Sequence, residues 1–178
     1  MFKRILIATH GTEGAKKAES YAIELAEALG ADLHGLYVIH KGWGSLVGIE
    51  WLHSSEKRME FYRYAESELY RMADVALTGF VQRAEAHGLN VKSSVRVGDP
   101  GDVIAEEAGA LGADIVIIGS NNNNVRSEEY KARISLKRLM KLAPCPVLVV
   151  NNKLEAIGRG GEKLKKQEHA PFLQETKL

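Results

Sequence analysis

Residues 4–9 read Arg4-Ile5-Leu6-Ile7-Ala8-Thr9, a continuous apolar run that Gly11 and Gly14 follow closely. Strands that are buried on both faces of a sheet have this pattern, because neither of their faces meets water. Two later runs repeat it, Asp114-Ile115-Val116-Ile117-Ile118-Gly119 and Pro146-Val147-Leu148-Val149-Val150. The three runs therefore predict three strands of a sheet that is covered on both faces.

Amphipathic helices are expected between the strands, because apolar residues recur there at spacings of three and four. Two such stripes are Ala18, Ala22, Leu25 and Leu29, and Tyr62, Ala65, Leu69, Met72 and Ala76. In a third helix Val103, Ile104, Ala108 and Leu111 are expected to face the core, and Ile134, Leu139 and Met140 suggest a last helix. Gly30 is the expected C-terminal cap of the first helix. Asp99 and Pro100 are the expected start of the third, as cap and first helical residue.

Two further strands complete the pattern. Residues 32–39 form one, and the even spacing of valines over residues 89–97 is typical of a strand at the edge of a sheet. Strands that alternate with helices predict an α/β fold, with one doubly wound, five-stranded parallel sheet and helices on both faces. Its strand order is 3-2-1-4-5 or 2-1-3-4-5.

Length and composition predict a single domain over residues 1–151, since the 178 residues are 45% apolar and 26% charged. Residues 152–178, with six basic and four acidic side chains, are expected to form a flexible tail. The chain's 24 basic and 23 acidic residues nearly cancel, which argues against a nucleic-acid partner. The single Cys145 excludes a disulfide framework. No apolar run suits a membrane and no signal peptide precedes the first strand, so we expect a cytoplasmic protein.

A ligand is expected at the carboxyl ends of the strands, where the winding of the sheet reverses. In the 3-2-1-4-5 order this point lies between the first and fourth strands. The candidate site then combines residues 9–14 with residues 119–124, and Val38 joins them from the end of the second strand.

Four stretches of this chain resemble the universal stress protein family. They are Ile5-Leu6-Ile7-Ala8-Thr9-His10-Gly11-Thr12-Glu13, Tyr21-Ala22-Ile23-Glu24-Leu25-Ala26, Val97-Gly98-Asp99-Pro100, and Gly119-Ser120 with Ala143-Pro144-Cys145-Pro146-Val147-Leu148-Val149-Val150. The resemblance covers residues 1 to about 151. It implies the 3-2-1-4-5 order, a homodimer and a regulatory or protective role in stress. Many members of the family bind ATP and others do not.

The ATP-binding motif of that family is degenerate here. Its members place a glycine, two residues, a second glycine, nine residues, and a third glycine followed by Ser or Thr. Gly119 matches the first glycine, but Asn122 takes the second place and Ala132 or Arg133 the third. Ser135 is the nearest hydroxyl, and His10 replaces the usual aspartate. The expected ligand-binding residues are Ala8, Thr9, His10, Val38, Gly98, Gly119, Ser120, Asn122, Arg133 and Ser135.

The function expected from these residues is a non-enzymatic stress-response protein that binds a nucleotide or another small anion, with weak affinity for ATP. Asn122 tolerates the left-handed backbone that a glycine would adopt, and Arg126, Lys131 and Arg133 add positive charge. The alternatives are an interaction module without a ligand and a slow ATP hydrolase. No nucleophile elbow surrounds Ser120, and no metal-binding pattern joins the histidines.

The last strand is expected to mediate a homodimer through Val147, Leu148, Val149 and Val150. These residues are apolar at four successive positions although the 3-2-1-4-5 order puts them at an edge, and edge strands are normally protected by Lys or Pro. A two-fold pairing with a second chain would cover them. The alternative is that the tail folds over this edge. Trp43 and Trp51, in the connection before the second helix, form a lid or partner surface, or else pack on that helix.

Overall fold

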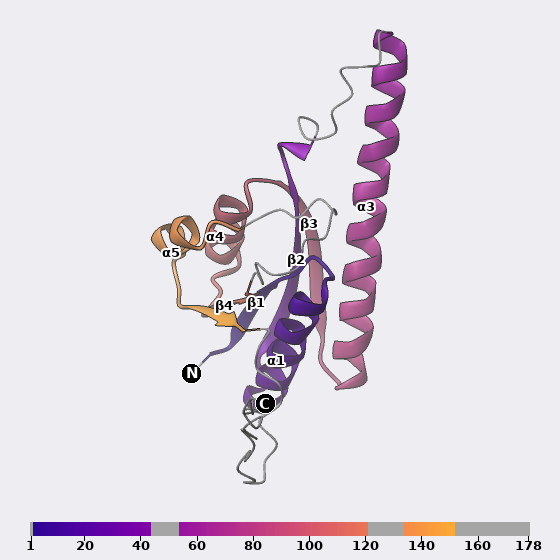
Figure 1. Cartoon of the computed structure of the whole chain (residues 1–178). Helices are drawn as coiled ribbons and strands as arrows, with labels where there is room; N and C mark the ends of the chain where they lie inside the picture. Colours follow the sequence, from indigo (N-terminus) through magenta and orange to yellow (C-terminus); the bar gives the residue numbers. More distant parts are fainter. Residues whose placement is uncertain (1, 44–53, 121–133, 152–178) are drawn as a thin grey trace, which may run out of the picture.

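The computed structural model describes residues 2–43, 54–120 and 134–151. They form a five-stranded parallel sheet in the order β3-β2-β1-β4-β5 (Figure 1). This confirms the fold class, and of the two strand orders considered it selects 3-2-1-4-5. The elements are β1 (Arg4–Ala8), α1 (Glu13–Leu29), β2 (Asp32–His40), α3 (Ser55–Ala86), β3 (Val91–Gly98), α4 (Pro100–Leu111), β4 (Ile115–Gly119), α5 (Leu136–Leu142) and β5 (Val147–Val150).

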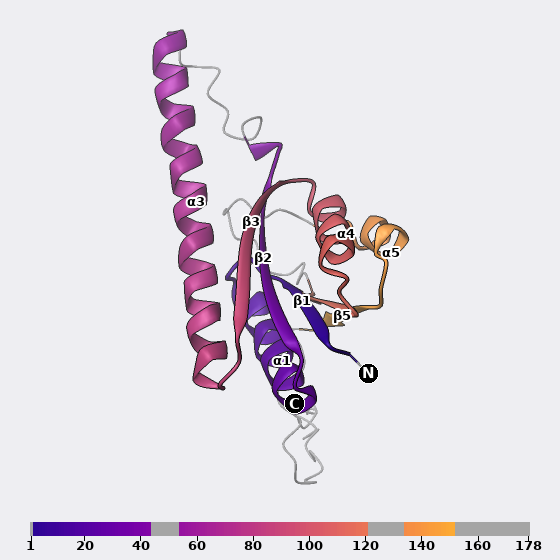
Figure 2. The ribbon, with the colours of Figure 1, turned by 180° about the vertical axis from the view of Figure 1, so that it is seen from behind.

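Helices cover both faces of the sheet, with α1 and α3 on one side and α4 and α5 on the other (Figures 1 and 2). β1 shows why a central strand is apolar at every position. Ile5 and Ile7 pack in the core under α1 and α3, whereas Leu6 and Ala8 pack in the core under α4 and α5. Successive side chains point to opposite faces, so both sets must be apolar.

The helix ends follow the local sequence rules. Gly30 caps α1 with φ of 60°, a left-handed backbone that glycine adopts without a steric penalty. Asp99 caps α4 by accepting a hydrogen bond from the Gly101 amide, and Pro100 is the first helical residue. The cap at Asp99 sets the point at which α4 begins after β3, and that point borders the candidate site.

α3 is longer than the sheet that it covers. Its buried residues are Ala73, Leu77, Phe80 and Ala84, all in its second half. Its first half projects beyond the sheet (Figures 1 and 2). The prediction that Met72 belongs to the buried stripe of this helix is wrong. Met72 is 50% exposed, and the buried stripe runs through its neighbour Ala73.

Of the two tryptophans in the connection before α3, Trp43 lies among the described residues. Trp43 contacts Tyr62 of α3 edge-on, with ring centroids 5.8 Å apart, so it packs on the following helix. Trp51 lies outside the described residues. The expected last helix is α5, in which Leu139 is buried and Met140 is 66% exposed.

β3 and β5 are the two edges of the sheet. In β5 the side chains of Leu148 and Val149 are 40% and 37% exposed, and Val150 is buried. None of the described helices combines the length and the apolar character that crossing a membrane would require.

Candidate functional site

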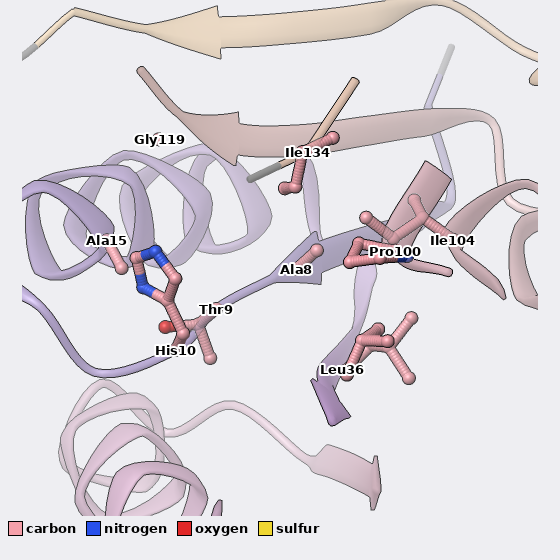
Figure 3. A pocket seen from close by; sticks show the side chains of 10 residues that line it. Ala8, Thr9, His10, Ala15, Leu36, Pro100, Ile104, Gly119 and Ile134 are labelled. Atoms are coloured by element: carbon pink, nitrogen blue, oxygen red, sulfur yellow. The ribbon is translucent and has the colours of Figure 1, made fainter. Parts of the chain in front are cut away.

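The carboxyl ends of β1, β2 and β4 meet α4 around one pocket (Figure 3). The residues that line it are Ala8, Thr9, His10, Ala15, Leu36, Val38, Pro100, Ile104, Gly119 and Ile134. The pocket therefore lies at the reversal of strand order between β1 and β4, where open α/β sheets bind their ligands. Its enclosed volume, as bounded by the described residues, is about 40 Å³.

The pocket has an apolar side and a polar side. Ala8, Leu36, Pro100, Ile104 and Ile134 form the apolar side, and Thr9 and His10 lie toward the start of α1 (Figure 3). An apolar wall beside a few polar groups suits a flat ring that carries polar substituents.

Thr9 is 5% exposed and its backbone amide donates to the carbonyl of Leu36 at 2.9 Å, which ties the end of β1 to β2. Its hydroxyl donates to the carboxylate of Glu19 and accepts from the amide of Gly11 at 3.2 Å. Because the single hydroxyl proton is committed to Glu19, this side chain shapes the turn instead of donating to a ligand.

Glu19 was not expected at the site, and it stands directly behind it. The side chain is 1% exposed in α1 and also accepts a hydrogen bond from Arg83 of α3. A buried carboxylate is tolerated when it is paired and hydrogen-bonded. The signal in the sequence is its spacing, since Glu19 lies four residues after Ala15 and four before Ile23, which are both buried.

His10 is exposed at the rim of the pocket, after the end of β1. Its Nδ1 lies 3.2 Å from the hydroxyl of Thr12, the residue that caps α1. This contact orients the ring beside the helix start, at the polar side of the pocket. Among residues 2–43, 54–120 and 134–151, no three His, Cys, Asp or Glu side chains are grouped so that they could hold a metal ion.

Gly119 has a packing role as well as a place at the pocket. A Cβ atom on this residue would lie 2.7 Å from the carbonyl oxygen of Gly14, in the first turn of α1. The end of β4 and the start of α1 can approach this closely only because Gly119 lacks a side chain. Gly98 is similar, since its Cβ would lie 2.4 Å from the Cγ2 atom of Val103.

The structure brings five of the expected site residues to the pocket, namely Ala8, Thr9, His10, Val38 and Gly119. Gly98, Ser120 and Ser135 are described but are not among the lining residues. Asn122 and Arg133, together with Arg126 and Lys131, lie outside the described residues. Sequence reasoning missed the lining residues Ala15, Leu36, Pro100, Ile104 and Ile134, because apolar residues carry no signal that separates a pocket wall from a core.

Asp102 and Arg138 hold α5 against α4 next to this wall. The guanidinium donates to both carboxylate oxygens, at 2.5 and 2.8 Å. The hydrogen bond from Arg138 lowers the pKa of Asp102 below its usual value, so the pair is charged at neutral pH.

A second polar cluster lies between α4 and the strands β2 and β3. His34 Nε2 is 2.9 Å from the hydroxyl of Ser94, which donates to Glu107 at 3.1 Å, and Arg96 donates to the other oxygen of Glu107 at 3.2 Å. His34 Nδ1 is buried without a hydrogen-bond partner. Nε2 also lies 3.6 Å from the carboxylate of Glu107. Both of these contacts are made by Nε2, so the cluster lacks the relay through two ring nitrogens that a catalytic triad needs.

Burial lowers the pKa of His34, whereas the nearby Glu107 carboxylate acts in the opposite direction. The imidazole is therefore neutral in the folded protein at neutral pH.

Solved structures with the same fold include nucleotide complexes. A universal stress protein family protein from Arabidopsis thaliana with AMP bound is 19% identical, with a TM-score of 0.55, over 84% of this chain and 91% of that one. A universal stress protein from Archaeoglobus fulgidus in complex with dAMP is 15% identical, with a TM-score of 0.54, over 84% and 98%. At these identities the likeness shows the fold alone.

Nearer relatives and a family model identify the family. A universal stress protein of Thermus aquaticus is 32% identical over 152 residues, which cover 84% of this chain and 99% of the relative. One from Methanocaldococcus jannaschii is 27% identical over 150 residues, 84% and 82% of the two chains. The solved hypothetical protein MJ0577 is 25% identical with a TM-score of 0.66, over 86% and 99%. The model of the Universal stress protein family matches residues 1–151, and the chain belongs to that family.

Proposed function

We propose that this protein binds an adenine nucleotide at the pocket between β1 and β4, and that it acts in the stress response as a non-enzymatic, cytoplasmic regulator. The observation that carries the proposal is the apolar wall of Leu36, Pro100 and Ile104 at the switch point of the sheet, with His10 on the rim. Relatives with this fold that hold AMP and dAMP support the choice of ligand class.

The ligand would enter base first. The apolar side chains of Leu36, Pro100 and Ile104 suit the base, so we place the base in the depth of the pocket. The ribose and the phosphates would then lie over the carboxyl ends of β1 and β4, near Gly119. Backbone amides at that edge suit phosphates, but the glycines that would let them approach closely are replaced by Asn122 and by Ala132 or Arg133.

Binding without hydrolysis is the favoured function, because the lining residues offer no carboxylate to hold Mg²⁺. Glu19, the nearest buried carboxylate behind the wall, is already engaged by Thr9 and Arg83. We expect no release of ADP when the purified protein is incubated with Mg-ATP.

Titration calorimetry with AMP and with Mg-ATP tests the proposal. We expect AMP to bind and Mg-ATP to bind no tighter than micromolar, because each lost phosphate contact costs about 1–3 kcal/mol. Val38→Phe fills the pocket and should abolish binding. Val97→Phe is the matched control, since Val97 is 49% exposed on β3 and is not a lining residue. Submicromolar binding of Mg-ATP would contradict the expected weakness, and no binding of any adenine nucleotide would contradict the proposed function.

A ligand-free interaction module is the second candidate, and the replacement of the motif glycines by Asn122 and by Ala132 or Arg133 favours it. In that case Val38→Phe would leave the assembly state unchanged and the titrations would show no heat. Under either candidate we propose a homodimer that pairs the exposed edge of β5, where Leu148 and Val149 lie.

A further inference from the structure

α3 carries a second apolar surface, on the side of the helix that faces away from the body. Tyr64 is 63% exposed, Met72 50% and Val75 61%. Phe61 lies three residues before Tyr64 and is partly exposed. Figures 1 and 2 show α3 along the outside of the molecule, with its first half clear of the sheet. No residue from Ser55 to Met72 is buried.

This surface, the outer face of α3, has the spacing of a coiled-coil seam. Phe61, Tyr64, Glu68, Arg71 and Val75 follow one another at intervals of three, four, three and four residues. The buried residues of α3 run from Ala73 to Ala84 along the opposite side. Apolar residues on two opposite sides of one helix can each pack against a partner, and within the part of the chain that the structure describes the body buries only one of these sides.

The outer face is complementary to itself when two copies run antiparallel. A pairing that sets Glu68 opposite the partner's Arg71 also sets Tyr64 opposite the partner's Val75, and Phe61 opposite the partner's Thr78. Glu68 and Arg71 form an ion pair within one chain at 2.8 Å, so the charges already stand at the centre of the face. In the helix pair, two ion pairs between the chains would lie on either side of the two-fold axis. The contacts of Tyr64 with the partner's Val75 would lie outside them.

The geometry of the chain permits this contact along the whole helix. The 32 residues of α3 span about 48 Å, or roughly four and a half heptads. The pairing centre, between Tyr70 and Leu69, falls near the middle of Ser55–Ala86. Because the buried residues of α3 face the body, the two bodies would lie on opposite sides of the helix pair.

We propose that the outer face of α3 binds the same face of a second copy of this protein, as an antiparallel helix pair centred on Glu68 and Arg71. The contact is isologous, so it joins two chains across a two-fold axis and no third chain can add to the same face. It is separate from the edge of β5 and from the nucleotide pocket, and it goes beyond the function proposed above.

Charge exchange at the centre of the face is the sharpest test. Glu68→Arg places only basic side chains at the centre of the pair, and Arg71→Glu places only acidic ones. Each variant alone should associate at least about tenfold more weakly than the unchanged protein, because like charges would face each other. An equimolar mixture of the two variants should recover association, since every pair across the axis is then of opposite sign. Sedimentation equilibrium over a range of concentrations measures this.

Arg63→Glu and Glu66→Arg are the matched controls. They change the same residue types at the same spacing in the same helix, but both residues lie off the outer face. Neither should weaken association. A disulfide provides a second readout, in a Cys145→Ser background that carries Tyr64→Cys and Val75→Cys. These positions are eleven residues apart in one helix, about 16 Å, so only two chains can join them. We expect a covalent dimer on oxidation.

Three results would overturn the proposal. One is a sedimentation mass, measured at about 100 µM protein, that is the same for the unchanged protein and for each of the two single variants. Another is a mixture of the variants that associates no better than each variant does alone. The third is an oxidised double-cysteine protein that migrates as a single chain under denaturing, non-reducing conditions.

Discussion

At the scale of single residues, Glu19 and Arg83 form an ion pair with unequal exposure. The carboxylate is 1% exposed whereas the side chain of Arg83 is 45% exposed. Arg83→Gln should therefore destabilise the fold by about 3 kcal/mol, because it leaves a buried charge without its cation. Glu19→Gln should cost less, about 1 kcal/mol, because water can solvate the remaining guanidinium. Urea unfolding of both variants measures the difference, and equal losses would contradict this reading of the pair.

His34 makes stability depend on pH. Burial lowers its pKa in the folded state, so the unfolded chain binds more protons just below the ordinary histidine pKa of about 6.5. The free energy of unfolding should fall as the pH drops through that value toward the folded pKa. His34→Gln removes the titrating group and should flatten this slope between pH 7 and pH 5 in urea unfolding.

His87 provides the control for that slope. It is exposed at the end of α3, with Nδ1 2.8 Å from Glu27. In His87→Gln, the free energy of unfolding should still fall between pH 7 and pH 5, because His34 is unchanged. A slope that persists in His34→Gln would show that another group carries the titration.

At the scale of elements, the contact between β4 and α1 depends on one glycine. Gly119→Ala should destabilise the fold by about 2–3 kcal/mol, since its Cβ would stand 2.7 Å from the Gly14 carbonyl and force the strand and helix apart. Gly109→Ala is the matched control, because its Cβ would meet only Pro144 at 4.0 Å and Gly109 lies within α4. It should stabilise by up to about 1 kcal/mol. Thermal unfolding separates the two, and a neutral Gly119→Ala would contradict the close approach.

The elements were predictable from the sequence where local chemistry decides them. Continuous apolar runs marked β1, β4 and β5, and Gly30 and Asp99 marked helix ends, because burial on two faces and capping are local properties. Met72 was misplaced because apolar residues lie on more than one side of α3, and the side that the sheet buries runs through Ala73. The apolar pocket wall and the buried Glu19 were missed for a related reason, since each depends on which distant element packs against it.

At the scale of the whole molecule, β5 presents an edge without the usual protection. Val147–Val150 contains no Lys and no Pro, and its described neighbour in the sheet is β4. Leu148 and Val149 remain 40% and 37% exposed. A second β5 strand running antiparallel across a two-fold axis would satisfy both the free backbone groups and these side chains.

Val149→Lys tests this pairing. A lysine at the centre of the edge would bring like charges together across the axis, so the variant should lose one association step and about half of its mass in analytical ultracentrifugation. Val97→Lys is the control, because it makes the same change at a 49% exposed position on β3, the opposite edge of the sheet. Deletion of residues 152–178 tests the alternative that the tail, and not a second chain, covers the edge of β5. If the tail covered β5, the deletion would raise the number of chains in the particle, whereas a β5 dimer remains a dimer when the tail is removed.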